Sequence, residues 1–251
     1  MEIIFLGTGT ASAIPQLHCE CKMCRKAAGK NRRTRASIAI IEKGKVLVVD
    51  TGPEYYGQII REKIPKVDVA LITHNHMDHT AGILNLRREE GVTLKAPPSV
   101  LKELKKEILR LKHRNPGLKA EVFRPFKWNG IMIKSVRLRH DKQEYGEKMP
   151  CLGFVFEKRG EKFAYLTDFD RIMEKKKLKN LDLMVSDGTQ MEATKGHLGV
   201  NGSIKLYNEL KPKKMLLTHM AHKNLPHEKL KAYCKKFGNI EPAFDGMRIK
   251  L

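Results

Sequence analysis

The stretch that decides the fold of this chain is Leu71-Ile72-Thr73-His74-Asn75-His76-Met77-Asp78-His79-Thr80-Ala81-Gly82. An apolar run, residues 69–72, is followed closely by three histidines and one aspartate within six residues. Such a run is typical of a buried strand, so we expect the polar cluster at the strand's C-terminal end and in the loop beyond it. Imidazole and carboxylate groups suit zinc, iron and manganese, and this many in one loop exceed the needs of a single tetrahedral ion. The stretch therefore indicates a metal site with two adjacent ions rather than a polar loop with incidental histidines.

Composition sets limits on the class of protein. The chain has 251 residues, 41% of them hydrophobic, which is enough for one large domain with an ample core. Its 49 Lys and Arg outnumber its 28 Asp and Glu, giving a formal net charge of +21. A field of this sign attracts polyanions such as nucleic acid or phosphorylated metabolites, although lysine-rich surfaces also occur in heat-adapted proteins. Both explanations of the charge stay open.

Signals for export and for membrane insertion are missing from the sequence. No stretch approaches the roughly 18 apolar residues of a membrane span, and the N-terminal residues do not have the pattern of a signal peptide. We therefore expect a cytoplasmic protein with no membrane partner, in which thiols stay reduced. Disulfides are then the less favoured use for the five cysteines.

A cysteine cluster near the N-terminus predicts a second kind of metal site. Cys19, Cys21 and Cys24 form a Cys-x-Cys-x-x-Cys pattern in a loop at about residues 18–30. Three thiolates at this spacing suit a tetrahedral zinc that takes its fourth ligand from elsewhere, and free or redox-active cysteines are the alternative. The adjacent His18 and histidines far downstream compete for the fourth position. Bound zinc would act as a staple for a loop that has little core of its own.

Other polar residues follow predicted strands in separate parts of the chain: Asp50 ends residues 45–50, His140 follows 131–139, Asp168 follows 162–167 and His219 follows 215–217. Strands with helices interspersed, and no linker or repeat, indicate a single domain over residues 1–251 with sheets inside and helices outside. We expect the strand-end residues to converge on one rim. An aspartate such as Asp50 either caps its strand or orients a metal-bound histidine.

One predicted helix, over residues 98–112, concentrates basic charge. Its apolar residues recur at helical spacing, with lysines between them: Leu101, Leu104, Ile108 and Leu111. This is the pattern of an amphipathic helix with a basic outer face. Because such charge runs are most often solvated surface, we assign the helix no chemistry from the sequence.

The ordered set of polar residues resembles that of the metallo-β-lactamase superfamily. The stretch His74-Asn75-His76-Met77-Asp78-His79 is similar to the His-x-His-x-Asp-His motif of that superfamily, and the strand-end residues occur in the superfamily's order. The resemblance implies an α/β protein, a four-layer αββα sandwich, with a two-metal site at the sheet edge.

The resemblance also implies how the ligands divide between the two ions. One ion would be held by His74, His76 and His140. The other would be held by Asp78, His79 and His219, and Asp168 would bridge both. Asp50 would orient a ligand from behind.

Within the superfamily, the chain is similar to the PhnP-type phosphodiesterases, which are relatives of tRNase Z. The cysteine cluster, the glycine turn that precedes it from Gly7, and the pair His219 and His222 carry this closer match. The match implies that His222 is the fourth ligand of a structural zinc, and that His197 lies beside the scissile phosphate. The long arm with which tRNase Z grips tRNA has no visible counterpart in this sequence.

The implied activity is metal-dependent hydrolysis of phosphoric diester bonds. A hydroxide bridging two divalent ions, zinc or manganese, would attack a small or cyclic phosphodiester, such as a phosphoribosyl cyclic phosphate or a cyclic nucleotide. Asp78 or Asp168 would accept the proton of the water, and His197 would act as general acid or stabilise phosphoryl charge. The alternatives are a nuclease of tRNase Z type, prompted by the +21 charge, and a non-catalytic metal-bearing binder of phosphorylated ligands. The resemblance is compatible with a homodimer.

Overall fold

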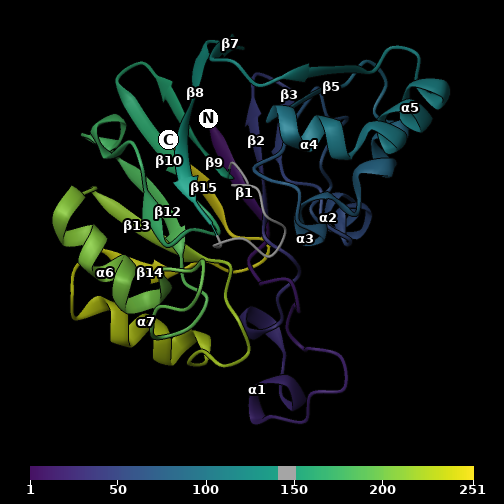
Figure 1. Cartoon of the computed structure of the whole chain (residues 1–251). Helices are drawn as coiled ribbons and strands as arrows, with labels where there is room; N and C mark the ends of the chain where they lie inside the picture. The colour runs from purple at the N-terminus through teal and green to yellow at the C-terminus, as the bar shows by residue number, and fades with distance from the viewer. Residues whose placement is uncertain (141–150) are drawn as a thin grey trace. The chain divides into compact units, whose positions relative to one another are not determined.

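The computed structural model describes residues 1–140 and 151–251, and these fall into two compact units. Unit 1 comprises Met1–Gly7, Arg35–Arg124 and Gly246–Leu251, and unit 2 comprises Thr8–Thr34 and Pro125–Asp245. Each unit is built on one mixed sheet with its own helices (Figure 1). The single domain over residues 1–251 stays a prediction.

The sheet of unit 1 has seven strands in the order β15-β1-β2-β3-β4-β5-β6. The strands are β1 (Glu2–Gly7), β2 (Ser37–Glu42), β3 (Lys45–Val49), β4 (Val69–Leu71), β5 (Thr93–Ala96), β6 (Lys119–Val122) and β15 (Arg248–Lys250). Pairing is antiparallel from β15 to β3 and parallel from β3 to β6. Because parallel strands end at the same edge, the residues after β3 and β4 lie at one edge of this sheet.

The helices of unit 1 are α2 (Tyr55–Arg61), α3 (Met77–Thr80), α4 (Pro98–Glu103) and α5 (Lys105–Arg114), with a 3₁₀ turn η2 (Ile83–Arg88). Their apolar residues form one core with alternate strand residues, for example Leu111 and Leu86 with Val48. One prediction needs correction. The helix expected over 98–112 is two helices, because the backbone leaves helical geometry at Leu104 (φ −83°, ψ 15°).

The sheet of unit 2 has eight strands in the order β11-β8-β9-β10-β12-β13-β14, with β7 paired to β8. The strands are β7 (Phe126–Trp128), β8 (Ile131–Arg139), β9 (Cys151–Lys158), β10 (Glu161–Tyr165), β11 (Arg171–Ile172), β12 (Leu183–Asp187), β13 (Lys214–Thr218) and β14 (Ile240–Pro242). Strands β10, β12, β13 and β14 run parallel. The C-terminal ends of these strands therefore share one edge, where Asp168, Asp187 and His219 lie within or just beyond them.

Helices complete unit 2: α1 (Lys22–Arg25), α6 (Gly199–Leu210) and α7 (His227–Lys235), with 3₁₀ turns η1 (Gly29–Asn31) and η3 (Lys175–Leu178). Helix α6 connects β12 to β13 and α7 connects β13 to β14, as parallel pairing requires. Residues of both helices, such as Val200 and Leu230, share a buried core with Met184 of β12.

The antiparallel pairs β2–β3 and β9–β10 are hairpins, and their turns show why the chain reverses there. Lys43 and Gly44 join β2 to β3 with φ of 49° and 73°, and Arg159 and Gly160 join β9 to β10 with φ of 50° and 86°. Two consecutive residues with positive φ match the twist of antiparallel strands, and glycine adopts this conformation without a Cβ clash.

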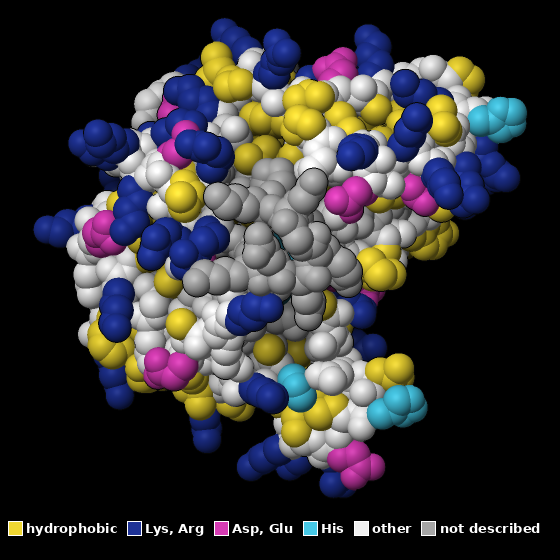
Figure 2. All heavy atoms as spheres, viewed as in Figure 1, with side chains coloured by type: hydrophobic (Ala, Val, Ile, Leu, Met, Phe, Trp, Pro, Cys, Tyr) yellow, Lys and Arg dark blue, Asp and Glu magenta, His cyan; other side chains and the backbone are white. Residues whose placement is uncertain are grey.

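Basic side chains are spread widely over the face of the molecule that Figure 2 shows. Figure 2 shows Lys and Arg distributed over the visible face, with fewer Asp and Glu among them. Among the residues that the structure describes, none of the helices combines the length and the apolar composition needed to cross a membrane.

Candidate metal centre

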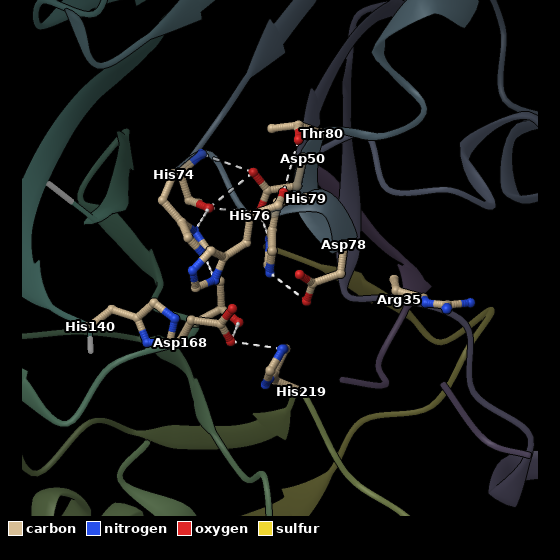
Figure 3. A network of polar contacts seen from close by, with 12 residues as sticks. Arg35, Asp50, His74, His76, Asp78, His79, Thr80, His140, Asp168 and His219 are labelled. Carbon is tan, nitrogen blue, oxygen red and sulfur yellow. Dashed lines mark hydrogen bonds and ion pairs between the residues drawn. The ribbon is translucent and has the colours of Figure 1, made fainter. Parts of the chain in front are cut away.

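Asp50, just beyond β3, organises the ligand loop of unit 1. Its buried carboxylate accepts hydrogen bonds from the backbone N–H of Thr73 at 2.8 Å and from Nδ1 of His79 at 2.7 Å (Figure 3). Burial raises the pKa of Asp50, and the contacts with His79 and Thr73 oppose that rise. Because Nδ1 of His79 carries the shared proton, Nε2 keeps the lone pair that can bind a metal. Asp50 thus holds the His79 ring in place and does more than end its strand.

Potential ligand atoms of this loop converge in two pairs. Nε2 of His74 lies 3.0 Å from Nδ1 of His76, and Nε2 of His79 lies 3.2 Å from Oδ2 of Asp78. The hydroxyl of Thr73 lies 2.9 Å from Nδ1 of His74 and so occupies the nitrogen that faces away from His76. Imidazole nitrogens and a carboxylate oxygen gathered in this way are the donor set that zinc or manganese accepts. The residues present therefore fit a divalent metal.

Two glycines let the ligand loop lie directly against the turn after β3. Thr51 accepts a hydrogen bond from the N–H of Gly82 at 2.8 Å and donates its own N–H to the carbonyl of His79 at 2.8 Å. A Cβ on Gly82 would lie 2.1 Å from the carbonyl oxygen of Gly52, and one on Gly52 would lie 2.3 Å from that of Asp78. No side chain fits between these two backbones, so the position of the ligands depends on both glycines.

Unit 2 contributes ligand candidates from three separate strand ends. His219, after β13, places Nε2 2.9 Å from Oδ1 of Asp168, which follows β10 (Figure 3). His140, after β8, donates from Nδ1 to the carbonyl of Gly196 at 2.9 Å, because a carbonyl only accepts. That bond leaves Nε2 of His140 as the nitrogen with a lone pair.

Asp187, the last residue of β12, has no role among the predictions from the sequence. Its buried carboxylate contacts Nδ1 of His197 at 3.0 Å and accepts the N–H of Gly199 at 3.0 Å and the hydroxyl of Thr189 at 2.9 Å. Ligand atoms of Asp187, His197, Asp168 and His219 all lie within 4.8 Å of one another. Because Asp187 holds the proton at Nδ1, the His197 ring has Nε2 available for another partner. The only sequence signal for Asp187 is an aspartate at the end of a predicted strand.

Backbone strain marks three of the candidate residues. Asp50, Asp168 and His219 have φ of 65°, 51° and 56°, in the left-handed region that L-residues rarely adopt. Each one turns the chain sharply just after a strand. Such residues cost of order 1–3 kcal/mol each and concentrate at functional sites.

The cysteine cluster lies entirely within unit 2, and its fourth member is His222. Sγ atoms of Cys19 and Cys21 lie 3.2 and 3.4 Å from Nδ1 of His222, and ligand atoms of these three residues and Cys24 all lie within 4.8 Å. His18, the competing candidate, is exposed and lies outside this group. All five cysteines are free thiols in this structure. Three sulfurs and one imidazole are a zinc-binding set.

The thiols of this cluster differ in how readily they ionise. The N–H of Cys24 and the ring of His222 lower the pKa of Cys21 to about 6. Burial raises the pKa of Cys24 to about 11. Cys21 therefore ionises more readily than Cys24, whose ionisation a nearby cation would favour. A zinc ion would provide that cation.

Comparison with known proteins shows which family these features belong to. Residues 45–220 match the Beta-lactamase superfamily domain. The chain is 27% identical over 237 residues to an octanoyltransferase of Porphyromonas gingivalis, across 88% of this chain and 46% of that protein. It therefore spans about half the length of that relative.

Two further relatives match along nearly their whole length. Coenzyme PQQ synthesis protein B of Methylorubrum populi is 27% identical over 271 residues, across 89% of this chain and 90% of that protein. The structure of a diphosphatase from the PhnP family is similar with a TM-score of 0.87 and 26% identity, across 99% of this chain and 96% of that one.

These matches confirm the resemblance and the fold class predicted from the motif, an α/β protein with the metallo-β-lactamase fold. They also support binding of divalent metal, for which the donor sets described above are suited. The chain belongs to the β-lactamase superfamily of metal-dependent hydrolases.

Proposed function

We propose that this chain is a metal-dependent phosphodiesterase that hydrolyses small or cyclic phosphodiesters. The observation that carries the proposal is the convergence of ligand atoms in the loop after β4, where Nε2 of His74 lies 3.0 Å from Nδ1 of His76. Two imidazole nitrogens that face each other at this distance can each offer a lone pair to a shared cation. Family membership supports the same reading, since similar structures include a hydrolase of phosphorus compounds, the PhnP-family diphosphatase.

Seven residues are the proposed ligands of two divalent ions, zinc or manganese: His74, His76, Asp78, His79, His140, Asp168 and His219. When bound, the two ions would lower the pKa of coordinated water and neutralise a phosphodiester anion. Asp78 or Asp168 would take the proton from the water, since a carboxylate oxygen of each lies beside a histidine ligand atom, at 3.2 and 2.9 Å. A third ion, a structural zinc, is proposed for Cys19, Cys21, Cys24 and His222.

His197 is the proposed general acid. Its Nδ1 faces Asp187 at 3.0 Å, so the second proton of an imidazolium would sit on Nε2, from which it can pass to a leaving oxygen. The Asp187 carboxylate would balance the charge of that imidazolium. The ring also packs against those of His140 and His219, two of the proposed ligands, with centroids 5.1 and 5.2 Å away, which supports a role near the metals.

Phosphorus chemistry has support among similar structures, because the PhnP-family relative is a diphosphatase. A hydrolysis panel tests the proposal: cyclic nucleotides, a phosphoribosyl cyclic phosphate, bis(p-nitrophenyl) phosphate, RNA, DNA and a β-lactam, each with zinc and with manganese. We expect turnover of the cyclic and small diesters and none of the lactam. The variant His197→Ala should lower kcat by about 10²- to 10⁴-fold without loss of metal.

The control variant is His113→Ala, which removes an exposed histidine at the end of α5. It should match the wild type in kcat and metal content. Absence of turnover for every diester with either metal would contradict the proposal and favour a non-catalytic binder of phosphorylated ligands.

A nuclease is the second candidate function, and the observation in its favour is the net charge of +21. A polynucleotide substrate would be bound with an affinity that falls steeply as salt is added. Cleavage of RNA or DNA in the same panel, faster than that of bis(p-nitrophenyl) phosphate, would make this the better description.

A further inference from the structure

Helix α5 carries a row of like charges that its own stability does not explain. Lys106, Arg110 and Arg114 follow one another at spacings of four residues, so they lie on one face, about 6 Å apart along the axis. Each like-charged pair at this spacing destabilises a helix by about 0.2–0.5 kcal/mol. The helix dipole favours cations only in the last turn, so it accounts for Arg114 but not for Lys106 or Arg110.

The two arginines of this row, and Arg87 of η2, are also not neutralised by carboxylates of the residues that the structure describes. Some basic residues elsewhere on the surface are paired with carboxylates, as Lys134 is with Glu157 at 2.7 Å and Lys213 with Asp182 at 2.7 Å. Within residues 1–140 and 151–251, no such ion pair involves Arg87, Arg110 or Arg114.

The same arginines surround a hollow of about 680 Å³ within unit 1. It is lined by η2 and α5, chiefly through Leu84, Arg87, Leu109, Arg110, His113 and Arg114, which we call the arginine hollow. Leu109 is 58% exposed, so the lining of the hollow is partly apolar while its cations reach solvent. In Figure 2, Lys and Arg side chains gather around the position of α5.

An exposed aromatic ring lies in the adjoining hollow. A second hollow of about 550 Å³ shares Arg87 with the first and is lined by α2 and η2, including Tyr56, whose side chain is 65% exposed. Arg88 lies there as well. The surface from α2 to α5 thus alternates cations with apolar or aromatic side chains.

We propose that the arginine hollow and the adjoining Tyr56 surface dock single-stranded RNA. Guanidinium groups bind phosphates through paired N–H donors, and guanidiniums without a carboxylate partner break no ion pair when they do so. Apolar and aromatic side chains between the cations give the faces of unstacked bases a place to pack. The net charge of +21 would draw a long polyanion towards this surface. This docking surface goes beyond the proposed hydrolysis, because none of its residues belongs to the candidate metal centre.

The test compares two variants with the same change of charge. One is the triple variant Arg87→Glu, Arg110→Glu and Arg114→Glu. The matched control is Arg159→Glu, Arg171→Glu and Lys229→Glu, which reverses three exposed cations of unit 2. Binding is measured by fluorescence anisotropy of a labelled 2′-O-methyl RNA of about 16 nucleotides, a length suited to single-strand sites, with the metal-loaded full chain at several salt concentrations.

We expect the hollow variant to bind at least about 10-fold more weakly than wild type and to show a shallower dependence on salt, by about one unit of slope for each phosphate that the variant no longer neutralises. The control variant should stay within about two-fold of wild type. In the hollow variant, Arg110→Glu gains an opposite-charge neighbour in Lys106 but keeps a like-charged one in Arg114→Glu, so circular dichroism is used to check that α5 stays folded.

Equal weakening in both variants would overturn the proposal, because it would mean that only the overall charge attracts RNA. Lack of RNA binding by the wild type would overturn it too, as would competition by an acidic peptide that displaces the RNA at equal charge concentration. Hydrolysis of bis(p-nitrophenyl) phosphate by both variants should equal that of wild type, so failure of RNA docking is distinguishable from failure of the proposed phosphodiesterase.

Discussion

The two units supply candidate ligands in opposite ways. Unit 1 takes four of them from six consecutive residues, His74 to His79, which are held by one buried carboxylate and two glycines. Unit 2 takes three from the ends of separate strands, each with its own supporting partner. Ligands in one contiguous loop are easy to recognise in the sequence, but a single change in the loop can displace all of them. Ligands that come from the ends of separate strands are harder to recognise, but each one depends on its own strand.

The largest expected effect is the loss of activity when one added methyl group displaces the ligand loop of unit 1. In Gly82→Ala the new Cβ would meet the carbonyl oxygen of Gly52 at 2.1 Å, so the turn that positions all four ligands must shift. We expect kcat/KM for bis(p-nitrophenyl) phosphate to fall by at least about 10⁴-fold with loss of metal, since water activation depends on bound ions. The matched control is Gly57→Ala in α2, where a Cβ has nothing within 4 Å. Full activity and metal content in Gly82→Ala would show that the loop does not depend on this close approach.

The cysteine cluster of unit 2 should respond in stability rather than in catalysis. Cys21→Ser removes one of four zinc ligands, and we expect one metal fewer per chain and a loss of about 4 kcal/mol in the free energy of unfolding. Hydrolysis by the folded protein should persist, because the cluster is separate from the proposed binuclear ligands. Elemental analysis and thermal unfolding measure these outcomes. His18→Ala is the control and should change neither quantity, whereas equal losses in both variants would assign the fourth ligand position to His18.

Acid should lower the stability of unit 2 through protonation of His227. Its Nδ1 accepts a hydrogen bond from buried Arg33 at 3.2 Å, and burial, with the Arg33 charge, lowers the pKa of His227 to about 4 from an ordinary value of 6.5. The unfolded chain binds the proton of this imidazole more readily than the folded chain does. The contribution of neutral His227 to the free energy of unfolding is therefore fully present above about pH 6.5 and is lost as the pH falls towards 4.

The expected loss from this one group is up to about 3 kcal/mol. Urea unfolding of wild type and His227→Gln at pH 7 and at pH 5 measures it. The variant should be less stable at pH 7 and lose less stability on acidification. An identical pH dependence in the two proteins would show that His227 contributes nothing to acid sensitivity.

The smallest expected effect concerns Asp187, whose carboxylate contacts Nδ1 of His197. In Asp187→Asn the amide would place an N–H donor towards Nδ1 of His197, which reverses the tautomer. We expect kcat to fall by about 10- to 100-fold, with KM and metal content unchanged. Asp182→Asn, which removes an aspartate paired with Lys213, is the control and should leave kcat unchanged. A loss of folding or metal in Asp187→Asn would instead mean that Asp187 has a structural role.

Sequence reasoning succeeded where chemistry is local and fell short where it depends on pairing between distant strands. The motif from His74 to His79 predicted both the fold class and the donor set, and hairpins were predictable because Lys43-Gly44 marks a tight turn. Asp187 was missed because its contact with His197 depends on how the loop after β12 folds back, which a strand-end aspartate alone does not reveal. The choice between His18 and His222 also stayed open on spacing, because the chain returns to the cysteines only after most of unit 2 has been built.

Local irregularities within helices and loops could also not be predicted from the sequence. The break at Leu104 divides the basic helix in two, although its apolar spacing is regular on both sides. The helical turn α3 lies inside the metal motif, where the sequence predicted a loop. Both depend on how short segments pack against the unit 1 sheet, which periodicity does not describe.

The most direct test of the central claim is a metal titration followed by turnover. The chain is stripped with a chelator, and zinc or manganese is added stepwise while hydrolysis of bis(p-nitrophenyl) phosphate is recorded. We predict negligible hydrolysis without metal and a rate that reaches its plateau only when about two ions beyond the structural zinc are bound. A plateau at background for every metal load, or full activity in the stripped protein, would contradict the proposal that these histidines and aspartates form a binuclear phosphodiesterase centre.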